Sequence, residues 1–335
     1  MQIIQLLDKF CFGGGERVAL TYQHTFNQLN LKNIIIALDG GRDSRPDGLH
    51  VVKNYRAYLS NLFKQLKTQL SHPSYLIAHT NRALVIGLMC KIFYGKKVKL
   101  IYVQHLFYSS FKLKVLSFAQ YWLDRYIQIT PITENLLKQH FLPEKCFYLN
   151  NYLALQTYVS ATNSNDILKE FLIFKDGRQV ITFLGRVTEG KNADHLLKLL
   201  KFLPQEKYVG LLLGTGDELE YIQELAEKWQ LDNLYIAGFQ EQPLAFLSVS
   251  EYMFFCSSCD EEMMPMAVLE AKALGCKVIG YQFDINSHIL PENNMFEYQD
   301  FEGIAQAIVD NRIANDENVY DEEYGVLRFK QLLGV

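Results

Sequence analysis

Short apolar runs alternate with longer amphipathic stretches along the whole chain. The short runs have four to six residues, a length typical of buried strands. The longer stretches carry apolar residues at helical spacing. Because continuous apolar strands that alternate with helices form parallel sheets covered on both faces, the pattern predicts an α/β fold. The predicted strands are residues 2–7, 33–38, 75–78, 98–103, 126–129, 180–184, 209–213, 234–237, 252–256 and 277–280, and the clearest helical patterns are residues 18–28, 55–70 and 113–123.

A polar segment, residues 156–166, separates two groups of five predicted strands. The 335 residues are enough for two domains. We therefore predict two doubly wound domains, residues 1–155 and 165–320, with a cleft between them. A C-terminal segment, residues 321–335, is expected to pack back on the N-terminal domain. Ligands of such sheets bind outside the carboxyl ends of the strands, so candidate side chains should follow strands directly.

The composition excludes several classes of protein. A hydrophobic content of 49% excludes a disordered chain. No apolar run reaches the roughly 18 to 20 residues that a membrane span requires, and no signal peptide begins the chain. The six cysteines are scattered through apolar segments and suggest no disulfide framework. We expect a reduced, cytoplasmic protein.

Charge is divided unevenly between the two halves. Residues 1–150 carry 19 Lys and Arg against 8 Asp and Glu, a net charge of +11, and residues 151–335 carry 14 against 29, a net charge of −15. This asymmetry indicates two domains with different partners. Residues 88–126 hold seven basic side chains, one acid and many interleaved aromatics. Such a segment is typical of a surface that rests on an anionic bilayer; alternatively, many of its aromatics face the core. The acidic second half argues against nucleic acid.

Two glutamates eight residues apart, Glu262 and Glu270, follow the predicted strand 252–256. Pro265 between them suits the first position of a helix. Glu262 then lies in the turn before the helix and Glu270 inside it. Carboxylates only accept hydrogen bonds, and a helix N-terminus binds anions. The pair predicts a ligand with hydroxyls at two ends and phosphates between them, such as a nucleotide sugar.

Glycine and basic residues also follow strands. The first strand is followed by three glycines, Gly13, Gly14 and Gly15, which allow the backbone to approach a ligand closely. The alternative is a tight turn without a ligand. Arg186 and Lys191 lie around the turn after the strand 180–184, where both are within reach of one diphosphate. For these two, the alternative is a solvated loop.

Further candidates are Gly238 with Phe239, and two histidines. Phe239 follows a strand end, where its ring either packs on a base or belongs to the core. His79 and His105 each follow an apolar strand, where a histidine can hydrogen-bond a hydroxyl or a phosphate oxygen. The alternative is a satisfied loop or core side chain. We favour His105 over His79.

These motifs together resemble the family-4 glycosyltransferases, retaining enzymes that use nucleotide-sugar donors. The run Gly13 to Val18 is similar to the family's Gly-Gly-Ala-Glu-Arg-Val turn. Arg186 and Lys191 are similar to its diphosphate-binding pair, and Glu262 and Glu270 match its E-x(7)-E motif. The resemblance implies the GT-B fold, two Rossmann-like domains with an interdomain cleft, the first binding the acceptor and the second the nucleotide sugar.

The resemblance also implies roles for individual residues. Glu262 is expected to contact hydroxyls of the transferred sugar, Glu270 the ribose diol, and His105 the region of the sugar and β-phosphate. The expected catalytic residues are Glu262, His105, Arg186 and Lys191, and the expected donor-binding residues are Gly13, Gly14, Gly15, Arg186, Lys191, Gly238, Phe239, Glu262, Met263, Met264 and Glu270.

The chain departs from the family pattern at two places. Met263 follows Glu262 where a glycine is common, and Tyr281 follows Gly280 where the family often has a Gly-Gly turn. Both positions lie near the transferred sugar in the family, so the departures affect the expected sugar specificity rather than the nucleotide site.

The sequence therefore predicts a retaining glycosyltransferase that moves a sugar from a UDP- or GDP-linked donor to a hydroxyl of a glycan or lipid-linked acceptor. We expect it to act in surface polysaccharide or lipopolysaccharide biosynthesis, with an anionic membrane surface as a candidate partner. No cofactor or catalytic metal is expected, because the chain has no Asp-x-Asp pair. Two alternatives remain open: a nucleotide-sugar epimerase of the same fold, and a non-catalytic partner subunit.

Overall fold

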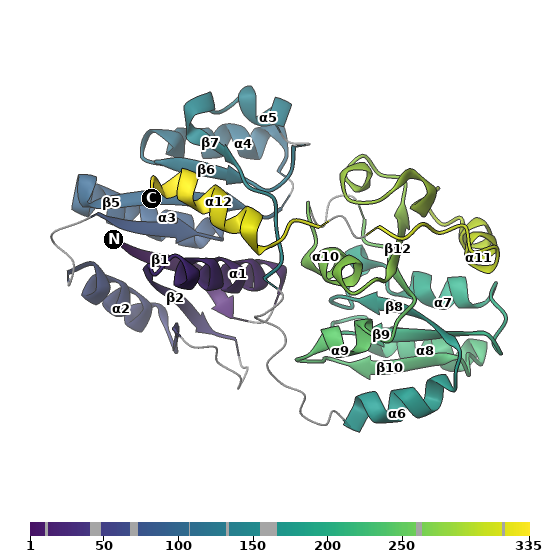
Figure 1. Ribbon diagram of the computed structural model, residues 1–335. Coiled ribbons are helices and arrows are strands. Elements are labelled where there is room, and N and C mark those ends of the chain that lie inside the picture. Colours follow the sequence, from purple (N-terminus) through teal and green to yellow (C-terminus); the bar gives the residue numbers. More distant parts are fainter. Residues whose placement is uncertain are drawn as a thin grey trace. The chain divides into compact units, whose positions relative to one another are not determined.

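The chain folds into two compact units, each built on one parallel sheet (Figure 1). The first unit comprises Met1–Thr157 and Tyr320–Val335, and the second comprises Tyr158–Val319. This computed structural model describes residues 1–10, 13–40, 48–67, 73–106, 108–131, 134–154, 166–258, 263–316 and 319–335. The predicted linker falls outside these ranges except for Asp166, the first residue of a helix. The predicted α/β class with two parallel sheets is confirmed.

The sheet of the first unit has seven strands in the order β3-β2-β1-β4-β5-β6-β7, and neighbouring strands are parallel. The chain therefore starts in the middle of the sheet, moves outward to one edge, and returns past β1 to build the other side. The strands are β1 (Gln2–Phe10), β2 (Lys32–Asp39), β3 (Leu49–Val52), β4 (Ser74–Ala78), β5 (Val98–Gln104), β6 (Arg125–Gln128) and β7 (Cys146–Tyr148).

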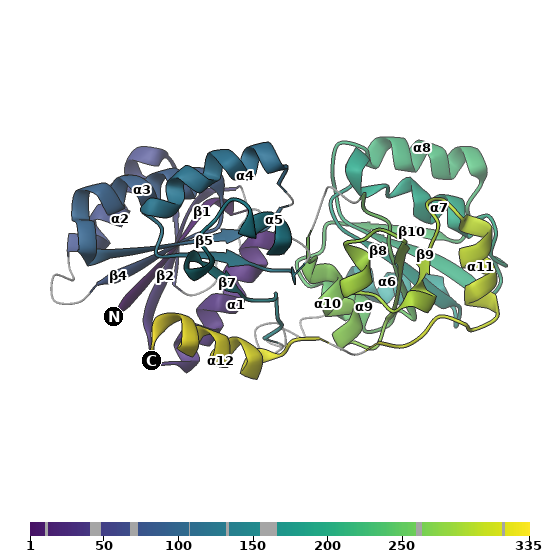
Figure 2. The same ribbon diagram turned by 90° about the horizontal axis from the view of Figure 1, so that it is seen from above.

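Helices cover both faces of this sheet. Since right-handed crossovers in opposite directions place helices on opposite faces, α1 and the helices after β3, β4 and β5 separate. Figure 2 shows α1 with α12 on one face and α2, α3 and α4 on the other. The helices are α1 (Gly14–Gln28), α2 (Tyr55–Lys67), α3 (Asn81–Tyr94), α4 (Ser110–Ser117), α5 (Glu134–Lys138) and α12 (Glu322–Leu333).

The C-terminal helix α12 is packed on the first unit. The buried Phe329 ring lies 4.7 Å from the rings of both Tyr22 and Phe26 on α1. Gly325 allows close approach, because a Cβ there would lie 2.1 Å from the Tyr152 ring. The N–H of Leu153 donates to a carbonyl just before α12, so the returning chain is also held by its backbone.

The second unit has a six-stranded parallel sheet in the order β10-β9-β8-β11-β12-β13. One core layer packs under α7, α8 and α11, and another under α6 and α9. Its strands are β8 (Gln179–Leu184), β9 (Tyr208–Leu213), β10 (Leu234–Gly238), β11 (Tyr252–Phe255), β12 (Lys277–Tyr281) and β13 (Met295–Phe296). Its helices are α6 (Asp166–Lys175), α7 (Asp194–Leu200), α8 (Leu219–Trp229), α9 (Pro243–Leu247), α10 (Met266–Ala273) and α11 (Phe301–Val309).

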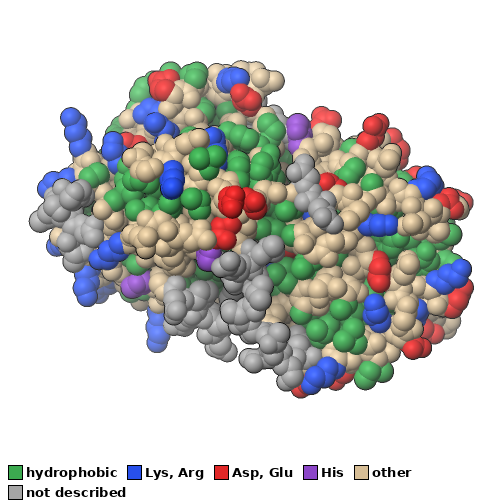
Figure 3. Space-filling model, in the orientation of Figure 1, with side chains coloured by type: hydrophobic (Ala, Val, Ile, Leu, Met, Phe, Trp, Pro, Cys, Tyr) green, Lys and Arg blue, Asp and Glu red, His purple; other side chains and the backbone are tan. Residues whose placement is uncertain are grey.

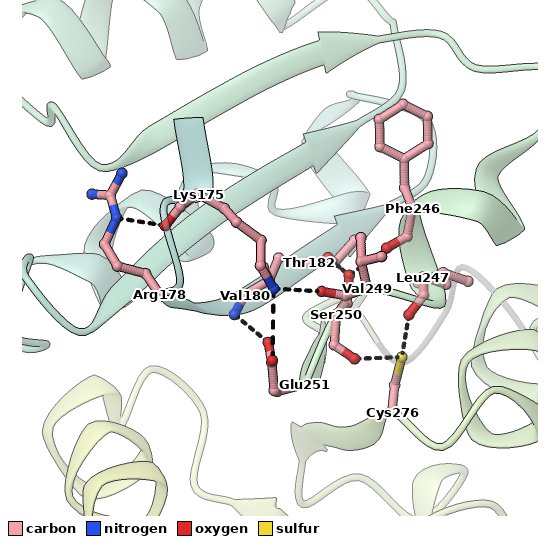
Figure 4. A network of polar contacts seen from close by, with 10 residues as sticks. All are labelled: Lys175, Arg178, Val180, Thr182, Phe246, Leu247, Val249, Ser250, Glu251 and Cys276. Atoms are coloured by element: carbon pink, nitrogen blue, oxygen red, sulfur yellow. Dashed lines mark hydrogen bonds and ion pairs between the residues drawn. The ribbon is translucent and has the colours of Figure 1, made fainter. Parts of the chain in front are cut away.

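A polar network holds the amino ends of the central strands in the second unit (Figure 4). The Glu251 carboxylate, just before β11, accepts a hydrogen bond of 2.6 Å from the N–H of Val180 on β8. The Lys175 Nζ lies 3.8 Å from that carboxylate. The hydroxyls of Thr182 and Ser250 are 2.7 Å apart. This end of the sheet is therefore closed by its own side chains, and the candidate site belongs to the opposite end.

All ten predicted strands are confirmed to within a few residues, and three short strands were missed. The missed strands, β3, β7 and β13, have only two to four residues each, too few to stand out as apolar runs of strand length. The helix predicted at residues 113–123 begins earlier and continues only as a 3-10 helix, Phe118–Tyr121. The Ser109 hydroxyl sets its start by accepting from the N–H of Lys112.

The surface reflects the uneven charge of the sequence. In the view of Figure 3, blue lysine and arginine side chains surround the first unit, and red acidic side chains are more frequent over the second. No helix in the described ranges is long and apolar enough to cross a membrane.

Candidate functional site

Each sheet has one point where the chain direction reverses. In the first sheet β1 and β4 are neighbours, but β1 leads to β2 on one side and β4 leads to β5 on the other. In the second sheet β8 and β11 stand in the same relation. Loops diverge at the carboxyl ends of such strand pairs and leave room for a ligand. The described residues of the predicted site lie at the carboxyl ends of β1, β5, β8, β10 and β11, in the loops there or in the helices that follow.

The glycine turn of the first unit adjoins His105. Gly13 is extended before the first residue of α1, and Gly14 opens the helix. A Cβ on Gly15 would lie 3.8 Å from the His105 ring, whereas a Cβ on Gly14 would meet nothing within 4 Å. The Glu16 carboxylate folds back toward Gly13, where a Cβ would lie 2.7 Å from its oxygen. The start of α1 thus offers backbone N–H groups next to an imidazole and a carboxylate.

A chain of hydrogen bonds fixes the His105 ring. The Gln5 Nε2 donates to the carbonyl of Ala19 at 2.9 Å, so its Oε1 faces the His79 Nε2, also at 2.9 Å. An amide oxygen only accepts, so His79 carries its proton on Nε2 and accepts at Nδ1. The His105 Nε2 lies 3.0 Å from that Nδ1 and must donate to it. These tautomers are assigned from the network.

The two histidines are neutral near pH 7. Burial lowers the pKa of His79 well below its ordinary value, and the neighbouring His105 lowers it further. Burial also lowers the pKa of His105 to about 4. Since its Nε2 is the donor, a neutral His105 has a lone pair on Nδ1, which no described residue occupies with a hydrogen bond. His105 therefore presents an acceptor suited to a hydroxyl.

In the second unit, the loops after three strands are joined by backbone hydrogen bonds that continue the sheet. The donors are the N–H groups of Gly185, Val187 and Gly214, and the acceptors are the carbonyls of Leu213, Thr215 and Gly238, at 3.0, 3.0 and 2.8 Å respectively. These loops consequently form a layer at the carboxyl edge of β8, β9 and β10.

Glycine is required where these loops touch. A Cβ on Gly214 would lie 1.8 Å from the carbonyl oxygen of Gly185, and Gly214 has a φ of +146°. A Cβ on Gly216 would lie 2.1 Å from the carbonyl oxygen of Val187. Gly238, in the predicted donor set, also has a positive φ of +66°, but a Cβ there would meet nothing within 4 Å. The first two glycines allow the contact between loops, and the third allows a turn.

The turn that carries Lys191 is attached to the loop after β11. Lys191 is buried, with 4% of its surface exposed, in the 3-10 turn Glu189–Lys191. Asn192 follows with a left-handed φ of 51°, and its Nδ2 donates to the carbonyl of Cys256 at 2.8 Å. The N–H of Ser258 donates to the carbonyl of Gly190 at 2.9 Å. The loops after β8 and β11 are therefore locked together where the chain direction reverses.

The other predicted residues of this unit vary in exposure. Arg186 is exposed, whereas Glu270 on α10 is buried, with 1% of its surface exposed. Met263 and Met264 are buried and Phe239 is half-buried. These residues come from the loops and helices that follow β8, β10 and β11.

Glu262 lies outside the described residues. Pro265 stands directly before α10, one position earlier than predicted, with the extended backbone of an N-cap.

Tyr281 stands where the family resemblance leads us to expect a glycine turn. It is instead the last residue of β12 and fully buried, and its hydroxyl lies 2.7 Å from the His195 Nδ1. The strand therefore extends one residue past Gly280, and the paired side chains of Tyr281 and His195 are buried at its end.

Residues 164–312 match the family model described as Glycosyl transferases group 1. The match lies within the second unit and covers less than half of the chain. An uncharacterized glycosyltransferase of Methanocaldococcus jannaschii is 30% identical over 177 residues, which are 50% of this chain and only 42% of that protein. The UDP-Gal:alpha-D-GlcNAc-diphosphoundecaprenol alpha-1,3-galactosyltransferase of Escherichia coli is 22% identical over 294 residues, which are 80% of this chain and 72% of that enzyme.

Solved structures with this fold cover the whole chain. Anabaena HepE in complex with UDP and glucose superposes with a TM-score of 0.76 at 17% identity, over 100% of this chain and 99% of that one. The pneumococcal O-GlcNAc transferase GtfA, in complex with UDP and GlcNAc, gives 0.76 at 12% identity, over 100% and 98%. The predicted GT-B fold with two Rossmann-like domains is thereby confirmed.

Several residues that shape the site were not predicted. Gln5 and the donating role of His79 were missed, although a polar residue inside an apolar strand is a signal for such a network. The loop contact at Gly214 and Gly216 was not predicted, because a contact between two loops has no signature in the local sequence. Among the described residues, no group of three or more His, Cys, Asp or Glu side chains is placed to hold a metal ion.

Proposed function

We propose that the chain is a retaining glycosyltransferase that uses a UDP- or GDP-linked sugar. The observation that carries this proposal is the edge of the second sheet within the family match, where the Arg186 and Lys191 loop is locked onto the loops after β9 and β11. A rigid, basic loop at the reversal point of a parallel sheet suits a nucleotide diphosphate. HepE and GtfA, of the same fold, were solved with UDP bound.

The donor roles follow from side-chain chemistry. Arg186 binds diphosphate oxygens from the exposed side, and the Lys191 ammonium adds a point charge from the buried side. Glu270 accepts hydrogen bonds from the ribose diol, as the family resemblance implies. Gly238 and Phe239 line the base, and Met263 and Met264 lie by the transferred sugar. The family resemblance assigns the sugar hydroxyls to Glu262, which lies outside the described residues.

The first unit is proposed to bind the acceptor, a glycan or lipid-linked glycan of a surface polysaccharide or lipopolysaccharide pathway. The E. coli relative is named for an acceptor that is a sugar linked to a lipid through a diphosphate. The Gly13 to Gly15 turn lets a substrate approach the backbone, and the His105 Nδ1 lone pair accepts from a hydroxyl. We propose accordingly that the reaction takes place at the inner face of the cytoplasmic membrane.

In the proposed reaction, the acceptor oxygen bonds to the anomeric carbon as the bond from that carbon to the phosphate oxygen breaks. The leaving diphosphate takes the acceptor's proton. Arg186 and Lys191 stabilise the charge that develops on it, and the hydrogen-bonded loop keeps them in place without reorganisation. The fixed His105 tautomer orients the substrate hydroxyl.

The test is a panel of UDP- and GDP-sugars with analysis of products in the presence and absence of acceptor glycans. We expect transfer with one donor. Arg186→Ala should lower kcat/KM at least a hundredfold, because it removes charge stabilisation of the leaving group. The matched control Arg312→Ala, an exposed arginine of the same unit paired with Asp310, should leave transfer unchanged.

The alternatives give different products. Conversion of the donor to an isomer without acceptor would indicate an epimerase. Nucleotide binding without turnover of any donor would indicate a non-catalytic subunit. Full activity of Arg186→Ala and Lys191→Ala would contradict the assignment of the donor site.

A further inference from the structure

Helix α3 of the first unit has a stripe of exposed apolar side chains. Val85, Met89, Ile92 and Phe93 are 58%, 46%, 65% and 73% exposed. Their spacing of three and four residues places them on one side of the helix. The other side carries the buried Ala83, Leu84 and Cys90 of the core. The exposed apolar side chains of this stripe therefore take no part in the core of the first unit.

A second stripe lies on α4 and the 3-10 helix that follows it. Its members are again large and exposed: Phe111 (78%), Val115 (55%), Phe118 (67%), Tyr121 (73%) and Trp122 (47%). Leu113, between them, is fully buried. The helical turn thus separates a core-facing side from an outward apolar side, as on α3.

The two stripes are held side by side. Both helices cover the same face of the sheet (Figure 2). At their starts, the Tyr108 hydroxyl donates to the Asn81 Oδ1 at 3.0 Å. At their ends, the Lys91 Nζ lies 2.7 Å from the Asp124 carboxylate. We call the surface formed by the nine exposed apolar residues of both stripes the α3–α4 face.

The charge around the α3–α4 face is positive. Asp124 is the single acid among residues 88–126, and it is engaged by Lys91 at 2.7 Å and Lys99 at 3.1 Å. Burial raises the pKa of Asp124, but the hydrogen bonds from Lys91 and the Leu100 N–H outweigh it, so the carboxyl stays ionised. The remaining basic side chains are exposed and have no acid of this segment to balance them: Lys96, Lys97, Lys112, Lys114 and Arg125.

We propose that the α3–α4 face docks on a lipid bilayer that contains anionic headgroups. Exposed aromatic and aliphatic side chains enter the headgroup region, and the lysines reach lipid phosphates. A second copy of the same face is disfavoured, because it would oppose lysines to lysines. The inference deepens the proposed use of a lipid-linked acceptor, but docking itself needs neither donor nor acceptor.

The test is co-sedimentation of the full chain with vesicles of phosphatidylcholine alone or mixed with phosphatidylglycerol. We expect at least about tenfold stronger binding to the anionic vesicles and a decrease with salt, since surface charges are screened. The double variant Phe111→Ser/Phe118→Ser should lose most of the binding. Ile173→Ser is the matched control, because Ile173 is 79% exposed on α6 of the second unit.

Trp122 provides an independent readout. With Trp229, the other tryptophan, changed to phenylalanine, Trp122 fluorescence should shift to shorter wavelength on anionic vesicles only. The proposal is overturned if binding is equal on neutral and anionic vesicles, or if Ile173→Ser loses as much as the double variant. It is also overturned if sedimentation velocity finds a dimer that the double variant abolishes.

These outcomes are distinct from those for the catalytic proposal. The double variant should keep full transfer to a water-soluble acceptor, because none of its changed residues belongs to the proposed donor or acceptor site. If the parent chain transfers sugar but does not bind anionic vesicles, docking alone is contradicted. Vesicle binding without transfer contradicts the proposed activity alone.

Discussion

Acidification should destabilise the first unit through its buried histidine pair. Burial lowers the pKa of His105 to about 4, whereas an unfolded histidine titrates near 6.5. Between these values the unfolded chain binds a proton that the native unit does not, so stability rises with pH. The contribution is fully present above about pH 6.5 and is lost as pH falls toward 4.

The magnitude follows from the two pKa values of His105. Each pKa unit corresponds to about 1.4 kcal/mol, so the full loss is about 3 kcal/mol, and about 2 kcal/mol of it has occurred at pH 5. The pKa of His79 is also lowered, so His79 acts in the same direction. A loss of this size is a large share of the stability of a typical domain.

The assay is urea denaturation at about pH 7.5 and about pH 5, with fluorescence as the signal. The chain has two tryptophans, Trp122 in the first unit and Trp229 in the second. In a Trp229→Phe background, Trp122 therefore reports the first unit alone. The comparison variant is His105→Gln, whose amide N–H can still donate to the His79 Nδ1 but does not titrate.

The variant should lose about 2 kcal/mol less than the parent between these pH values. If both proteins lose the same free energy of unfolding, His105 is not the group that senses acid. If His105→Gln is more acid-sensitive than the parent, the assigned tautomers are wrong as well.

Three further substitutions test packing, each by urea denaturation with the tryptophan of its own unit as reporter. Gly214→Ala should lower the free energy of unfolding by at least about 3 kcal/mol, because its Cβ would lie 1.8 Å from a backbone oxygen at a φ of +146°. Gly238→Ala is strained only by its φ of +66° and should lower it by about 1 kcal/mol. Equal losses of stability would contradict the loop contact. Glu251→Ala should cost about 2 kcal/mol by leaving a buried strand N–H without its acceptor, and Glu251→Gln should restore most of it. Phe329→Ala should cost about 3 to 5 kcal/mol, and a loss below about 1 kcal/mol would mean that α12 is not anchored by this ring.

The central strands were predictable because burial on both faces imposes continuous apolar runs. Strands such as β8 and β9 are buried over nearly their whole length, so their sequences consist mostly of apolar residues. The edge strand β3 is half-buried at every residue, and its sequence Leu-His-Val-Val carries no comparable signal. Edge strands depend on a neighbour's hydrogen bonds more than on their own burial.

The candidate site was predictable where chemistry and position coincide in the sequence. Arg186 and Lys191 follow a strand with a clear apolar run. Because that strand lies at the reversal point of the sheet, a ligand site is expected there. The sequence does not say that Lys191 is buried and Arg186 exposed, because this depends on the hydrogen bonds of Asn192 and Gly190 to the loop after β11. Nor does it show that His79 orients His105, because that depends on two partners 26 and 74 residues from His79 in the sequence.

The two reversal points are built alike but differ in charge, and the difference matches the proposed ligands. The second unit offers a guanidinium and an ammonium, which a diphosphate requires because its charge must be neutralised as it leaves. The first unit offers His105, which burial holds neutral and whose Nε2 donates to His79. A neutral acceptor of this kind suits a hydroxyl, because it carries no charge that a diphosphate would pair with. The same sheet topology can therefore hold either substrate, and the few side chains that follow its central strands decide between a hydroxyl and a diphosphate.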